Sequence, residues 1–166
     1  MAEIVVPDPE PDWERALDDQ VFPSKNPARQ YFTFEQAIGG FRLISGLKVN
    51  LDDVARRLRL DLEPGVEHQL GPVCAAFFTI RRIGFAVHRY DHEEHTLVSL
   101  HRRDETPTID AIDALLEALG VDWRAVATVV FGEGRGMRAV EPVLDDNLRP
   151  TFPQAADEVG RPGRDG

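Results

Sequence analysis

The chain has very few of the features that mark secreted or membrane proteins. Among its 166 residues there is one cysteine, Cys74, which cannot form a disulfide within the chain and indicates a reducing compartment. No apolar stretch approaches the roughly 20 residues that span a bilayer as a helix. The start, Met-Ala-Glu-Ile, turns acidic at once and lacks the basic and apolar segments of a signal peptide. We therefore expect a cytoplasmic protein that makes no contact with a membrane.

Positive charge is also scarce. The chain has 19 Lys and Arg against 29 Asp and Glu, which gives a net charge of −10. Nucleic-acid binding needs a basic surface, so this balance argues against a nucleic-acid partner. It permits a basic protein partner or a metal ion, although charge kept for solubility explains it equally well. Lysine occurs only at Lys25 and Lys48, an arginine preference that we attribute to a GC-rich bacterial genome.

The sequence lacks the spacing of the common catalytic and binding motifs. The glycine-rich stretch 132–136 has the composition of a phosphate loop, but not the Gly-x-Gly-x-x-Gly spacing, and no convincing helix follows it. Residues 51–58 resemble the first helix of a helix-turn-helix, but the turn and the recognition helix do not follow. The sequence alone assembles no serine–histidine–acid set.

What the sequence does contain is a group of strand-like segments between Cys74 and Arg103. They are short runs rich in Val, Ile, Thr, Phe and Tyr, separated by turn-like gaps at 81–84 and 92–95, which predict a three-stranded antiparallel meander. Residues 41–47 are a candidate fourth strand. Helical patterns occur on both sides of the meander, the longest from Thr108 to Leu119. The predicted fold class is therefore α+β, a small antiparallel sheet packed against helices.

Composition divides the chain into three parts. Residues 1–30 form an acidic, proline-rich N-terminal arm, because proline blocks helices and removes a backbone donor. Residues 31–131 form a single α+β domain of the common size. Residues 132–166 are rich in Gly and Pro and are expected to be a disordered C-terminal tail.

The predicted pairing of the second hairpin separates its side chains into two faces. Pairing Ala86 with His101 and His88 with Ser99 places successive side chains on opposite faces of the sheet. One face is apolar and is expected to join the last helix in the core, and the other, the histidine face, is polar. The predicted core residues are Phe78, Ile80, Phe85, Val87, Val98, Leu100, Ile112, Leu116 and Leu119.

The histidine face is one candidate site. It carries His88, His92, His95 and His101, and the predicted turn makes His92 and His95 cross-strand neighbours, roughly 5 Å apart at Cβ. Imidazole is the commonest metal ligand, so zinc or another divalent metal is a candidate cofactor. A solvated polar hairpin is the preferred interpretation, because the spacing is not the helical His-Glu-x-x-His of the zincins.

Two charged groups and one aromatic residue are candidate partner contacts. The arginines gather at one end of the predicted sheet, where they could bind a carboxylate or phosphate, or form ordinary surface ion pairs. The acids line one face of the last helix, where they could dock a basic partner or simply be solvated. The candidate partner-binding residues are Asp110, Asp113, Glu117, Tyr90, Arg81, Arg82, Arg102 and Arg103.

These patterns favour a noncatalytic function. The sequence predicts an acidic protein-binding module without a cofactor, an adaptor or a neutraliser of a basic partner protein. The alternative is a metal-binding protein or metal-dependent enzyme that uses the histidine face of the 85–102 hairpin. Convergence of the four histidines in the folded chain would favour the alternative.

Overall fold

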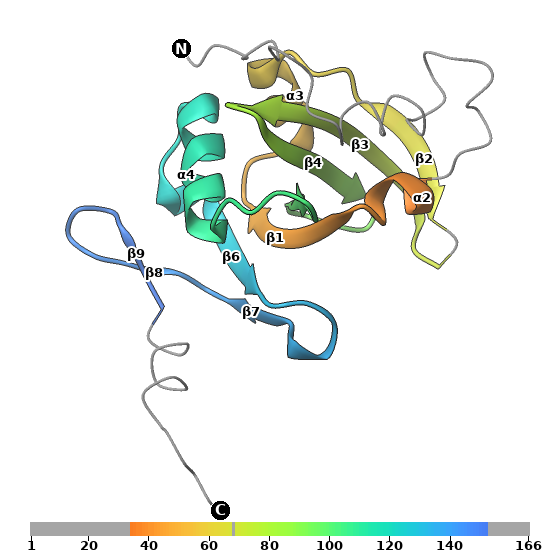
Figure 1. The fold of residues 1–166 in the computed structure, drawn as a ribbon. Helices are drawn as coiled ribbons and strands as arrows, with labels where there is room; N and C mark the ends of the chain where they lie inside the picture. Colours follow the sequence, from red (N-terminus) through yellow and green to blue (C-terminus); the bar gives the residue numbers. More distant parts are fainter. Residues whose placement is uncertain (1–33, 68, 153–166) are drawn as a thin grey trace, which may run out of the picture.

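The fold is built on one large antiparallel sheet (Figure 1). A computed structural model describes residues 34–67 and 69–152. Seven strands follow the order β2-β3-β4-β5-β1-β6-β7, and β8 and β9 form a separate two-stranded sheet. The predicted α+β class is confirmed, but the sheet has seven strands rather than the expected three or four. The elements are α2 (Phe34–Ile38), β1 (Phe41–Leu47), α3 (Leu51–Leu58), β2 (Glu63–Glu67), β3 (Gly71–Ile80), β4 (Ile83–Tyr90), β5 (Thr96–His101), α4 (Thr108–Leu119), η3 (Trp123–Ala125), β6 (Val126–Phe131), η4 (Gly134–Gly136), β7 (Arg138–Val140), β8 (Val143–Leu144) and β9 (Pro150–Thr151).

The predicted meander is present as β3, β4 and β5, and the candidate strand 41–47 is β1. The first turn of the meander consists of Arg81 and Arg82, both in the left-handed region with φ of 51° and 67°. Two left-handed residues make the tight hairpin turn whose twist matches that of the flanking strands. The turn lies at the start of the expected gap at 81–84, because Ile80 pairs with Ile83.

The second hairpin has a different register from the predicted one. Ala86 lies opposite Ser99 rather than His101, and His88 lies opposite Leu97 rather than Ser99. The register differs because residues 91–95 form a loop outside the ladder, in which the Glu93 amide donates to the Tyr90 carbonyl at 3.0 Å. A shift by two residues leaves the side chains that remain in the ladder on their predicted faces, since the side-chain period of a strand is two.

The domain continues beyond residue 131. β7 pairs with β6, and β8 and β9 follow, so the expected disorder is wrong for residues 132–152. The glycines after β6 form a tight turn rather than the start of a disordered tail. Gly132 has a φ of 78°, and a Cβ there would lie 2.4 Å from the Gly136 carbonyl oxygen. The expected arm 1–30 and residues 153–166 lie outside the described ranges.

The main core lies between one face of the sheet and helices α3 and α4. All nine predicted core residues are buried there, and the Phe78 and Phe85 rings stack at 5.6 Å. The side chain of Asn50 caps α3 by accepting from the Asp52 amide at 2.8 Å. Gly120 ends α4 in the left-handed conformation.

The histidine face of the sheet is also buried in part. Phe34 and Ala37 of α2 pack there on Val73, Ala75 and Tyr90. Alternation along β3 and β4 places these residues opposite to the main core, so α2 covers the other face from α3 and α4. Within the described ranges, no helix has both the length and the apolar character needed to cross a bilayer.

Candidate functional site

His88 is a core residue of the histidine face. Its side chain is 5% exposed and its ring lies 5.0 Å from that of Phe34 and 5.4 Å from that of Tyr90. Burial lowers the pKa of His88 to about 4, so its imidazole is neutral at pH 7. Its Nδ1 atom is buried and has no hydrogen-bond partner in the described structure.

The other three histidines lie in different surroundings. His101 is buried, its Nδ1 accepts from the Arg103 amide at 3.2 Å, and burial followed by the charge of Arg103 lowers its pKa. His92 is exposed and stacks on Tyr90 at 5.7 Å, and His95 is half-buried in the loop.

The structure does not bring the four histidines together. Tyr90 separates His88 from His92, and the loop removes His92 and His95 from the ladder that was expected to pair them. Among residues 34–67 and 69–152, no group of three or more His, Cys, Asp or Glu side chains is placed to hold a metal ion. Tyr90, an expected partner contact, is buried and donates its hydroxyl hydrogen to Glu67.

The four candidate arginines are at the same end of the sheet. The pairing of Phe85 with Leu100 brings the end of β5 beside the Arg81–Arg82 turn. Arg81 forms an ion pair with Glu117 of α4 at 2.8 Å. Arg102 forms one with Glu133 at 2.9 Å and donates to the Gly39 carbonyl at 3.0 Å. All four arginines are exposed.

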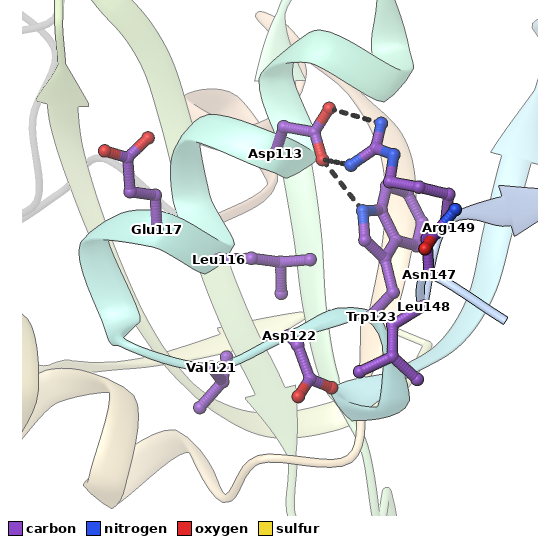
Figure 2. A pocket seen from close by; sticks show the side chains of 9 residues that line it. All are labelled: Asp113, Leu116, Glu117, Val121, Asp122, Trp123, Asn147, Leu148 and Arg149. Carbon is purple, nitrogen blue, oxygen red and sulfur yellow. Dashed lines mark hydrogen bonds and ion pairs between the residues drawn. The ribbon is translucent and has the colours of Figure 1, made fainter. Parts of the chain in front are cut away.

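The candidate acids all lie on α4, and Asp113 is at the centre of a polar cluster. Both of its carboxylate oxygens accept from Arg149, at 2.8 and 3.0 Å, and the indole Nε1 of Trp123 donates to the same carboxylate at 2.8 Å (Figure 2). The hydrogen bond from Arg149 is the main cause of a lowered pKa for Asp113, against the opposing effect of burial. The acid is therefore ionised at neutral pH.

An open groove of about 450 Å³ lies beside this cluster, between α4, the start of η3 and the loop that joins β8 to β9. The groove combines apolar and acidic side chains (Figure 2). It includes two of the three predicted α4 acids, Asp113 and Glu117, while Asp110 is exposed outside its lining. The lining residues are Asp113, Leu116, Glu117, Val121, Asp122, Trp123, Asn147, Leu148 and Arg149.

Local sequence signals build one wall of the groove. After Gly120, the carboxylate of Asp122 accepts from the Arg124 amide at 2.9 Å and so begins η3, which turns Trp123 inward to 3% exposure. The side-chain hydrogen bond from Arg124 lowers the pKa of Asp122 to about 2. The carboxylate of Asp122, at the rim of the groove, is therefore ionised at neutral pH.

The β8–β9 loop builds the opposite wall. The carboxylate of Asp145 accepts from the amides of Asn147 and Arg149, both at 2.9 Å, which closes the turn. Leu148 has a φ of 59°, a left-handed conformation that is unfavourable for a residue with a branched side chain. This turn aims Arg149 at Asp113.

Asp113 and Glu117 are groove residues that the sequence predicted as site residues, whereas Trp123, Leu148 and Arg149 were not predicted. The Asp145-Asp146-Asn147 run is a turn signal that could have indicated a hairpin there. The contact of Arg149 with Asp113 of α4 joins residues 36 positions apart, and no local pattern encodes such a contact.

Comparison with known proteins adds no relative: no family model matches the chain, and neither a curated protein nor a solved structure matches it.

Proposed function

We propose that this protein is a noncatalytic binding module that docks a basic segment of a partner protein in the groove beside α4. The observation that carries the proposal is the composition of the groove. Val121 and Leu148 offer apolar surface beside the buried Leu116, while Asp113, Glu117 and Asp122 place carboxylates around it. A peptide that alternates basic and apolar side chains matches both features.

The charge of the molecule supports a basic partner. The net charge of −10 attracts a cationic segment over distances of about a Debye length, roughly 8 Å at physiological salt. The groove acids already have arginine neighbours, but these pairs are accessible to a competitor: Glu117 is 66% exposed and its partner Arg81 is 56% exposed. Surface pairs of this kind stabilise a fold by about 0–1 kcal/mol, so a partner can replace them at small cost.

The chemistry of the lining supports binding rather than catalysis. Of the described residues that line the groove, none is a His, Cys, Ser or Lys. The two lining carboxyl groups with shifted pKa values, Asp113 and Asp122, are both shifted downward, which makes them weaker bases. A general base for neutral pH needs the opposite shift.

The proposal can be tested through the fluorescence of Trp123. Trp123 is one of two tryptophans, so a Trp13→Phe background makes it the only reporter. We expect a peptide of alternating arginine and leucine to change this fluorescence on binding, and a glutamate–leucine peptide to have no effect.

Charge reversal supplies the control. Glu117→Lys should weaken binding of the arginine–leucine peptide roughly 3–10-fold at low salt, mainly through slower association. Glu94→Lys is the matched variant, because Glu94 is exposed and lies at the other end of β4 from the Arg81–Arg82 turn. Equal weakening by both variants would mean that only net charge matters, and would contradict docking in the groove.

A further inference from the structure

The carboxylate of Asp113 has the features of a built receptor for a guanidinium group. Its two oxygens accept side by side from the two terminal nitrogens of Arg149, at 2.8 and 3.0 Å. The buried indole of Trp123 donates to the same carboxylate at 2.8 Å and so fixes its orientation (Figure 2). Parallel two-point bonding suits the planar guanidinium of arginine and does not suit the ammonium of lysine.

The arginine that occupies this receptor belongs to a peripheral element. β8 and β9 form their own two-stranded sheet, which stands apart from the main sheet in Figure 1. Residues 145–149 are all exposed, and Leu148, directly before Arg149, has an unfavourable left-handed backbone. The loop therefore presents Arg149 to the groove at a conformational cost, and little packing around the loop itself opposes its movement.

We propose, on the basis of the function proposed above, that the groove recognises an arginine side chain of its partner, and that Arg149 occupies the same position in the free protein. The partner's arginine replaces Arg149 on Asp113, and the β8–β9 loop moves aside. Arg149 is thus an internal competitor that lowers the affinity of the groove. Arg149 could instead have a purely structural role and hold the hairpin against α4. In that case, removing its side chain would leave the affinity of the groove for the partner unchanged or would lower it.

The experiment measures peptide affinity by titration calorimetry with the full chain. The probes are a blocked peptide with one arginine between two leucines and the same peptide with lysine. Arg149→Ala should bind the arginine peptide about tenfold more tightly than the original chain, because the receptor no longer spends most of its time occupied. The lysine peptide should gain less than about threefold, since it cannot form the two-point contact.

Arg124→Ala is the matched control. Arg124 is an exposed arginine at the rim, paired with Asp122 at 2.7 Å, so its removal changes the local charge as Arg149→Ala does but leaves Asp113 occupied. We expect Arg124→Ala to give less than about half of the tenfold gain in peptide affinity, because it removes only a nearby positive charge. Adding Asp113→Asn to Arg149→Ala should remove the gain, because an amide offers one acceptor and no charge.

The outcomes separate the two proposals. If neither peptide binds the original chain or Arg149→Ala, the proposed function itself is wrong. If the arginine peptide binds both with equal affinity, the groove binds basic segments but Arg149 is no competitor. Arginine recognition would be overturned if Arg149→Ala raised the affinity for the arginine and lysine peptides equally. It would also be overturned if Arg124→Ala raised the affinity as much as Arg149→Ala does. Either result would leave charge alone as the cause of the tighter binding.

Discussion

His88 shows most clearly how one residue can depart from the role that its neighbours in the sequence indicate. It lies in a run of histidines and acids that predicts a polar hairpin, yet Phe34 and Tyr90 enclose its ring. The alternation of side chains along the strand correctly predicted the face of the sheet on which His88 lies. It could not give the burial of that face, because the covering residues come from α2, some fifty positions earlier in the chain.

The burial of His88 predicts a loss of stability in acid. Its pKa is 6.5 when unfolded and about 4 when folded, so between these values the unfolded chain binds more protons. The stabilisation is complete above pH 6.5 and is lost as the pH falls through 4, an effect of about 3 kcal/mol. Urea unfolding from pH 7 to pH 4 should therefore show a weaker pH dependence for His88→Gln.

The matched variant for this measurement is His92→Gln. His92 is exposed four residues later, and its loss should leave the pH dependence of the unfolding free energy as it is in the original chain. NMR titration gives a direct check on the cause. An imidazole of His88 that titrates near 6.5 in the folded protein would show that burial does not suppress its protonation.

At the scale of elements, length decides what the sequence reveals. α4 and the strands of the meander are long enough for their periodicity of apolar residues to be read, and all nine predicted core residues lie in these elements and are buried. β7, β8 and β9 have only two or three residues each, which is too short for any period. Their pairing follows from tertiary contacts, and for that reason residues 132–152 were mistaken for a tail.

The turn between β3 and β4 is a place where one substitution should stabilise the fold. Arg82 adopts a φ of 67°, which a side chain disfavours and glycine does not. We expect Arg82→Gly to raise the free energy of unfolding by about 0.5–1 kcal/mol, after allowance for the greater freedom of glycine in the unfolded chain. Thermal and urea unfolding would measure the gain.

The same substitution within a strand provides the contrast. Arg89→Gly, near the end of β4 but still paired with Cys74 of β3, should lower the free energy of unfolding, because glycine weakens a paired strand. A lower stability for Arg82→Gly as well would mean that the Arg82 side chain makes a contribution larger than its backbone cost.

At the scale of the whole molecule, the candidate site depends on a C-terminal segment that the sequence analysis assigned to a tail. Asp113 and Glu117 could be proposed from the helical spacing of α4, whereas the opposite wall of the groove comes from residues 147–149. These residues are held by contacts at both ends of the β8–β9 hairpin. Leu144 and Phe152 pack against the main core, and the Phe152 ring meets Phe131 at 5.1 Å.

Shortening the chain tests whether this segment belongs to the domain. A chain that ends at residue 144 loses Arg149 and Phe152, whereas one that ends at residue 152 keeps both. We expect the shorter chain to be less stable by about 1–3 kcal/mol, from one lost surface ion pair and one lost aromatic contact with the core. Phe152→Ala in the full chain should account for the larger part of this loss and Arg149→Ala for the smaller part, about 1 kcal/mol. Equal urea midpoints for the two shortened chains would show that residues 145–152 lie on the surface of the domain without stabilising it.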